Sequence, residues 1–152
     1  MNLNTPTIRL YESHDKFELL HLLDLNTPTY FAASERADLE HYLENERELY
    51  YVISFENQII GCGGINFEEE KTIAIISWDI IHPDYQGKSF GSLLLKHRLS
   101  ELQSITTIQK IIVRTSQLTH LFYEKHGFVL KEKITDYWAL GFDLYYMEYL
   151  EF

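Results

Sequence analysis

Apolar positions recur along the chain with two spacings, which predict alternating strands and helices. Seven stretches rich in β-branched and aromatic residues are typical of strands: 7–11, 49–55, 59–67, 72–81, 111–113, 128–135 and 142–150. Four stretches carry apolar residues at helical spacing: 14–25, 35–46, 92–100 and 117–126. Ser13 and Ser34 stand where N-caps are expected, and Gly127 stands where the last helix ends. We therefore expect the order β-α-α-β-β-β-α-β-α-β-β within a single domain, residues 1–152.

The strand predicted over 59–67 contains three glycines, at positions 61, 63 and 64. Glycine weakens a strand interior and often marks a bulge or a close approach of another backbone. The turn 56–58 joins this strand to the preceding one as a hairpin. The following stretch, 72–81, is apolar enough to be a buried central strand.

A short loop of small residues connects this central strand to a helix. Gly87, Ser89 and Gly91 leave the loop little side-chain bulk, and Lys88 adds a positive charge. The free N–H groups and the dipole of a helix N-terminus favour an anion at such a place. A phosphate or pyrophosphate site is therefore predicted, and an ordinary turn into a helix is the alternative. A Walker A loop is excluded because His82 stands where its first glycine is required.

Composition narrows the classes of function. The formal net charge of −10 disfavours a nucleic-acid partner and suits a cationic substrate, although solubility alone also explains it. Cys62 is the single cysteine, so neither an intrachain disulfide nor a thiolate metal cluster is expected. The seven histidines show no ligand spacing, so we predict no metal. The sequence has neither a membrane-span pattern nor a signal-peptide pattern, which predicts a cytoplasmic protein without membrane partners.

Two motifs resemble those of the GNAT acetyltransferase superfamily. The loop 86–91 resembles its pyrophosphate loop through Gln86, Phe90 and Gly91, with Ser89 in place of the first glycine and as a candidate helix cap. The second motif, Phe122-Tyr-Glu-Lys-His-Gly-Phe128, is similar to the family's Tyr-Glu-Lys-x-Gly-Phe segment almost letter for letter. Ser116 replaces an asparagine often found at the start of that helix.

The resemblance implies the GNAT fold, an α/β domain whose mixed, mostly antiparallel sheet of six or seven strands is flanked by about four helices. It also implies an N-acetyltransferase that uses acetyl-CoA and no metal. The cofactor-binding residues carried over by position are Ile80, Ile81, His82, Gln86, Gly87, Lys88, Ser89, Phe90, Gly91, Ser92, Ser116 and Phe122. Ile80, Ile81 and His82 are expected to act mainly through their backbone, which would pair with the pantetheine amides.

Catalytic roles follow from the same resemblance. Tyr123 is expected to protonate the leaving CoA sulfur, and a backbone N–H near Asp79 to face the thioester carbonyl. The base is less defined, because Ile75 stands where some relatives have glutamate. Asp79 is the first candidate, since a period of two places it on the same strand face as Ile75. Glu68 and a water chain are the alternatives.

The acceptor is expected to be a primary amine. The negative net charge of the chain favours a small cationic amine over a peptide N-terminus or a lysine. Tyr30 and Phe31 are candidate pocket residues by resemblance, and Glu68 is a further candidate for attracting an amine. The aromatic tail over 137–149 suits an acceptor pocket, a homodimer interface or core packing. A CoA-binding sensor or interaction module without turnover is the alternative function, because Ser89, Ser116 and Ile75 depart from the family pattern.

Overall fold

The computed structural model describes residues 4–151. Its strands are β1 (Thr7–Leu10), β2 (Leu49–Phe55), β3 (Gln58–Glu68), β4 (Ile73–Ile81), β5 (Lys110–Thr115), β6 (Phe128–Ala139) and β7 (Phe142–Tyr149). Its helices are α1 (Lys16–Leu25), α2 (Glu35–Asn45), α3 (Phe90–Gln103) and α4 (His120–Lys125). Short 3-10 turns, η1 (Ser13–Asp15) and η2 (Pro83–Tyr85), precede α1 and α3. The predicted order of elements is confirmed.

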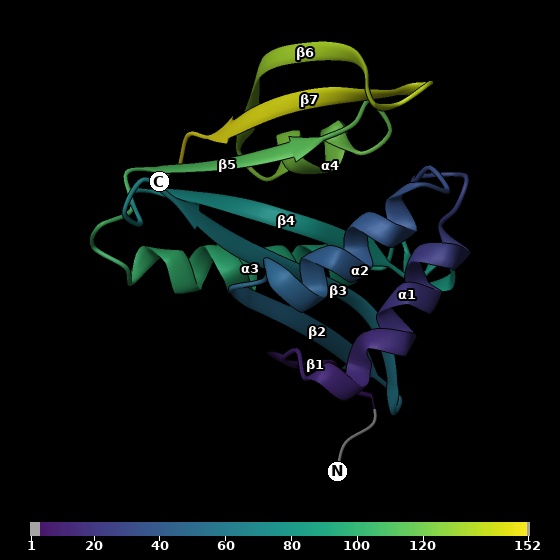
Figure 1. Ribbon diagram of the computed structural model, residues 1–152. Helices are drawn as coiled ribbons and strands as arrows, with labels where there is room; N and C mark the ends of the chain where they lie inside the picture. The colour runs from purple at the N-terminus through teal and green to yellow at the C-terminus, as the bar shows by residue number, and fades with distance from the viewer. Residues whose placement is uncertain (1–3, 152) are drawn as a thin grey trace.

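One sheet runs through the molecule in the order β1-β2-β3-β4-β5-β7-β6. Within residues 4–151 only the β4–β5 pairing is parallel, and the other five neighbouring pairs are antiparallel. Helices α1 and α2 cross one face of the sheet, and α3 and α4 lie on the other (Figure 1). The mixed, mostly antiparallel sheet with four helices agrees with the expected fold class.

Each face of the sheet carries its own hydrophobic core. Leu94, Leu95, Leu99 and Leu102 of α3 pack with apolar residues of β3, β4 and β5. On the other face, leucines of α1 and α2 pack against β2 and β3, with Ile80 of β4 among them. Burial on both faces explains why the central strands are nearly continuous runs of apolar residues.

Of the two expected N-cap positions, that of Ser34 is right and that of Ser13 is wrong. Ser13 lies within the 3-10 turn, and Asp15 is the residue at the start of α1. Ser34 does precede α2, but its side chain makes no capping hydrogen bond. Instead, the carboxylate of Glu35 accepts a hydrogen bond from the Ala32 N–H at 2.7 Å. A side chain in the first turn therefore satisfies a donor in the preceding loop.

Strand β4 departs from regular pairing on both of its edges. Toward β5, the paired residues run only from Ile73/Lys110 to Ile76/Val113, so the two parallel strands separate beyond that point. Toward β3, the register shifts between the pairs Gly64/Ser77 and Cys62/Ile80. Two residues of β4, Trp78 and Asp79, therefore lie opposite Gly63 alone, and Trp78 has a φ of 50°. The extra residue of this β-bulge is in β4, opposite the glycines of β3, and not in β3 itself.

Beyond the bulge, the side chains of β4 occupy the opposite face of the sheet from the one that strict alternation predicts. Ala74 and Ile76 pack on the α3 face, whereas Trp78 and Ile80 pack on the α1–α2 face. Strict alternation would have placed all four side chains on one face. Asp79 therefore points toward α3 and α4, opposite to Ile75, and its expected placement on the same face as Ile75 is wrong.

Candidate active site

A cavity of about 620 Å³ lies where β4 and β5 separate. Its walls come from the second half of β4, the end of β5, the N-terminus of α3, the helix α4 and the segment 26–35. Eleven of the predicted cofactor and catalytic positions line it: Asp79, Ile80, Ile81, Gln86, Gly87, Ser89, Gly91, Ser92, Ser116, Phe122 and Tyr123. The two motifs, far apart in the sequence, therefore meet at one cavity of a size typical for small-molecule ligands.

The loop before α3 opens the N-terminus of that helix to the cavity. Gly87 and Ser89 have φ angles of 72° and 71°, in the left-handed region that favours glycine. Gly91 packs against Phe122, and a Cβ added at Gly91 would lie 3.4 Å from the ring. The hydrogen bond from the Leu93 N–H to Ser89 O is the first i to i−4 bond of α3. The amides before Leu93 therefore have no acceptor within the helix.

Three predicted residues of this loop differ in how they lie relative to the cavity. Ser89 does not cap α3, because its side chain makes no capping hydrogen bond. The ammonium of Lys88 lies 5.7 Å from the centre of the Tyr85 ring, and Lys88 is not part of the cavity wall. Phe90 is buried against Phe55 and Tyr85 in the α3 core. Of these residues, only Ser89 lines the cavity.

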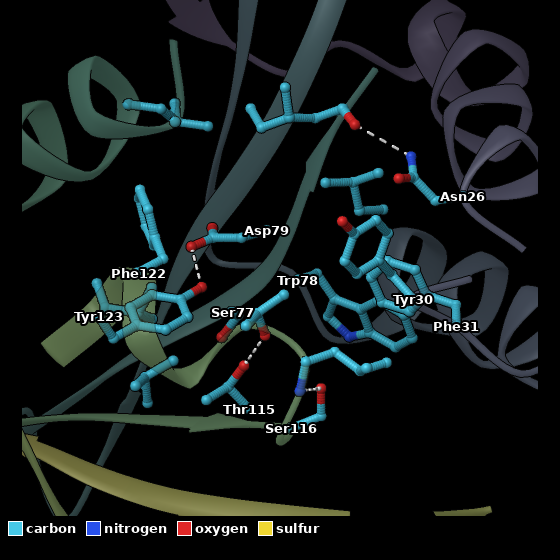
Figure 2. Close-up of a pocket in the computed structure, with 18 of the residues that line it drawn as sticks. Asn26, Tyr30, Phe31, Ser77, Trp78, Asp79, Thr115, Ser116, Phe122 and Tyr123 are labelled. Atoms are coloured by element: carbon cyan, nitrogen blue, oxygen red, sulfur yellow. Dashed lines mark hydrogen bonds between the residues drawn. The ribbon is translucent and has the colours of Figure 1, made fainter. Parts of the chain in front are cut away.

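Gln86 is held by a residue that the sequence analysis did not select. Its amide nitrogen donates to Asn26 Oδ1 at 2.9 Å and to Ile81 O at 3.0 Å. Asn26 is buried at the end of α1, and its own amide donates to Leu22 O and to Ile81 O. Figure 2 shows the second of these bonds. Asn26 therefore ties α1, the end of β4 and the loop before α3 together.

The backbone at the end of β4 is only partly open to the cavity. Ile81 O accepts hydrogen bonds from both Asn26 and Gln86, and the His82 N–H donates to Ile60 O at 2.7 Å. His82 does not line the cavity, and its Nδ1 accepts a hydrogen bond from the Asp84 N–H. The β5-facing edge of β4 beyond Ile76 has no strand partner within residues 4–151.

A buried ionic cluster lies beside this open edge. The Tyr123 hydroxyl donates to Asp79 Oδ2 at 2.5 Å, as Figure 2 shows. Arg98 Nη1 lies 2.6 Å from Asp79 Oδ1, and the contact is a close ion pair outside hydrogen-bond geometry. Burial, followed by the charge of Asp79, raises the pKa of Tyr123 well above its ordinary value. The phenol is therefore protonated at neutral pH.

The opposite wall of the cavity is aromatic. Phe31 stacks on Trp78 with ring centres 6.2 Å apart, and Tyr30 lies beside them in Figure 2. Tyr42 lines the same region, and its hydroxyl donates to Asn66. Glu35 adds the one buried carboxylate of this wall among residues 4–151, and burial raises its pKa. Tyr30 and Phe31 thus line the cavity, as predicted.

Glu68 lies elsewhere. It pairs with Ile73, at the opposite end of β4 from the cavity. Asp79 lies six positions beyond Ile73 along the strand, which is about 20 Å. Glu68 is therefore not brought together with Tyr123 or with the aromatic wall.

Comparison with known proteins agrees with this geometry. A family model described as an acetyltransferase (GNAT) domain matches residues 46–130, which is more than half of the chain. The chain belongs to the GNAT acetyltransferase family. An amino-acid acetyltransferase of Actinobacillus pleuropneumoniae serotype 3 (strain JL03) is 32% identical over 131 residues. That match covers 84% of this chain but 28% of the relative, so the chain spans less than a third of the relative's length.

Solved GNAT structures share the fold. The ribosomal-protein-S18-alanine N-acetyltransferase from Escherichia coli has a TM-score of 0.78 at 19% identity, covering 95% of this chain and 93% of that one. An aminoglycoside 6'-N-acetyltransferase complexed with coenzyme A has a TM-score of 0.75 at 14% identity, covering 93% and 95%. None of the helices within residues 4–151 has the length and apolar character needed to cross a membrane.

Sequence reasoning missed Arg98, Asn26 and Trp78 in this GNAT site. A signal existed for Arg98, because it lies four residues from Leu94 and from Leu102, within the apolar stripe of α3. A charged residue inside such a stripe is buried and needs a partner. The sequence indicated Asn26 only as the end of a helix. Trp78 was not selected because the bulge in β4 that turns its side chain to the α1–α2 face was not foreseen.

Proposed function

We propose that the chain transfers the acetyl group of acetyl-CoA to a primary amine by direct attack in a ternary complex. The observation that supports this most is the single cavity shared by the α3 N-terminus, the unpaired edge of β4 and the Tyr123 hydroxyl. The diphosphate would lie at the amides between Gln86 and Ser92. The pantetheine arm would follow β4 toward Tyr123, with Ser116 and Phe122 beside it.

The chemistry then divides between two residues. Tyr123 protonates the CoA sulfur as the carbon–sulfur bond breaks, while the amine nitrogen bonds to the acetyl carbon. Asp79 is the candidate base, and its Oδ2 accepts a hydrogen bond from the hydroxyl of Tyr123, the candidate acid. A proton taken from the amine by Asp79 can therefore return to the Tyr123 oxygen, which balances the reaction. A positioned acid of this kind gives roughly a 100- to 10,000-fold rate increase.

A small cationic amine is the acceptor we favour. Aromatic faces attract cations, and Glu35 supplies a carboxylate at the same wall as Phe31 and Trp78. The net charge of −10 adds long-range attraction. An amino acid is the second candidate, because the matched relative is named an amino-acid acetyltransferase. The guanidinium side chain of Arg114, which also lines the cavity, suits its carboxylate.

The test is thiol release from acetyl-CoA with a panel of amines: spermidine, kanamycin, L-glutamate, Nα-acetyl-lysine and a peptide with a free N-terminus. We expect at least one amine to raise release well above the rate without acceptor, and Tyr123→Phe to abolish most of that increase. If no amine raises release while calorimetry still detects CoA binding, the chain is a binding module without turnover. Glu35→Gln separates the acceptors, because it should raise KM for spermidine and leave KM for L-glutamate unchanged.

A further inference from the structure

Arg98 is a buried cation that the proposed chemistry does not use. Its side chain is 1% exposed, on the face of α3 that packs against the sheet. Nη1 donates to Gly64 O at 3.0 Å, and Nε donates to Leu94 O at 3.2 Å. Its one carboxylate partner among residues 4–151 is Asp79. An arginine removed from water is retained only where partners compensate its charge.

The bulge in β3–β4 makes room for this pair. A Cβ at Gly63 would overlap Asp79 Oδ1 and would lie 2.8 Å from Arg98 Nη1. Gly63 is the residue that faces both Trp78 and Asp79 across the bulge. The glycine and the bulge together therefore bring Asp79 to the α3 face, where Arg98 holds one of its oxygens and Tyr123 contacts the other.

We propose that Arg98 is a positioning residue, which fixes the Asp79 carboxylate so that Asp79 in turn holds the Tyr123 hydroxyl at the cavity where the thioester would react. This inference rests on the proposed function. The charged groups that act on the Tyr123 hydroxyl are Asp79 from β4 and Arg98 from α3. Tyr50 of β2 interacts in turn with this ion pair and with Cys62 of β3. Arg98 contacts Asp79, and Asp79 in turn contacts the phenol, so Arg98 acts through the carboxylate.

A double-mutant cycle tests the inference: wild type, Arg98→Met, Tyr123→Phe and the double variant, assayed with acetyl-CoA and the panel amine of highest kcat/KM. We expect Arg98→Met to lower kcat about 100-fold or more with KM for acetyl-CoA within threefold, since a positioned acid contributes that much. In the Tyr123→Phe background the same substitution should lower kcat by a much smaller factor, because only the proposed base role of Asp79 is then left to disturb. Equal losses of kcat in both backgrounds would mean a structural role and overturn the proposal.

The pH profile gives a second readout. Removing a cation makes a neighbouring carboxylate easier to protonate. The acid limb of the kcat profile should therefore move to higher pH in Arg98→Met, and Arg98→Lys should return it toward the wild-type position. An acid limb that stays in place contradicts the proposal. If Arg98→Met does not fold, Arg98→Lys replaces it in the cycle, with an intermediate loss of kcat expected only when Tyr123 is present.

Failure of this inference differs from failure of the proposed function. If the wild type shows no amine-dependent thiol release, the proposed function fails. If the wild type turns over and the Arg98 and Tyr123 substitutions act independently, only the role of Arg98 is wrong. Calorimetric CoA binding and thermal unfolding of every variant provide the folding controls.

Discussion

Ser89 occupies a backbone conformation that suits glycine, and replacing it should stabilise the protein. Its φ of 71° nearly equals that of Gly87, at 72°, two residues earlier in the same loop. The Ser89 side chain is exposed and makes no capping hydrogen bond, so Ser89→Gly removes no contact of that kind. Gly87→Ala is the matched reverse change, because a Cβ added at Gly87 meets nothing within 4 Å. The two substitutions therefore differ mainly in backbone strain.

The expected magnitude follows from two opposing effects. A left-handed conformation costs an L-residue roughly 1–2 kcal/mol, and Ser89→Gly relieves this cost. Glycine also gives the unfolded chain more freedom, which offsets roughly 0.5–1 kcal/mol of that gain. The net stabilisation should be about 0.5–1 kcal/mol, or a rise in Tm of about 1–4 °C for a chain of this size. Gly87→Ala should lower Tm by a similar amount.

Thermal unfolding followed by circular dichroism measures both shifts, and calorimetry with CoA adds the affinity. A residue without Cβ lets a phosphate approach the loop more closely, so Ser89→Gly should lower the Kd for CoA by up to about fivefold, which is about 1 kcal/mol. If Tm falls in Ser89→Gly, or stays unchanged in Gly87→Ala, the loop is not strained at these positions and the reasoning is refuted.

Three further predictions concern the cavity. Tyr123→Phe should lower kcat about 100- to 10,000-fold with little change in the Kd for CoA, and an unchanged kcat would exclude Tyr123 as the acid. Asn26→Ala should cost about 2 kcal/mol by removing buried hydrogen bonds to Gln86 and Ile81, which lowers Tm by about 4–8 °C, and a wild-type Tm would contradict this network. Burial raises the pKa of Glu35 above its ordinary value of 4.5. The folded state therefore binds more protons at Glu35 than the unfolded state, and the free energy of unfolding falls as pH rises above that ordinary value. Glu35→Gln should lack that fall in urea unfolding between pH 5 and pH 8, and an identical pH dependence in both proteins would refute the assignment.

Much of the fold could be predicted because the apolar pattern reports burial directly. The order of elements and the antiparallel hairpin of β2 and β3 follow from residue spacing, and the glycines of β3 mark the place opposite the bulge in β4. The phase of the bulge could not be predicted. Trp78, a residue that rarely adopts positive φ, carries the left-handed conformation, and this reverses the face of Asp79. A rule based on period two fails at such a position.

The candidate site was predictable where chemistry is local and unpredictable where it depends on distant partners. Gly87, Gly91 and Tyr123 belong to short motifs, and each lines the cavity. Asn26 is 60 residues from Gln86 in sequence, and their contact depends on how α1 packs beside the end of β4. Side chains that join separate elements in this way leave no periodic pattern. The roles of these residues in binding and catalysis stay predictions.

The separation of β4 from β5 also bears on how readily the protein could self-associate through its sheet. Beyond Ile76, the middle of the sheet presents a strand edge of the kind that normally occurs only at its borders. Exposed edges are templates for intermolecular β-pairing, and a ligand lying along this one would shield it. We expect the empty protein to aggregate faster than the CoA-saturated protein at equal temperature, which light scattering would measure.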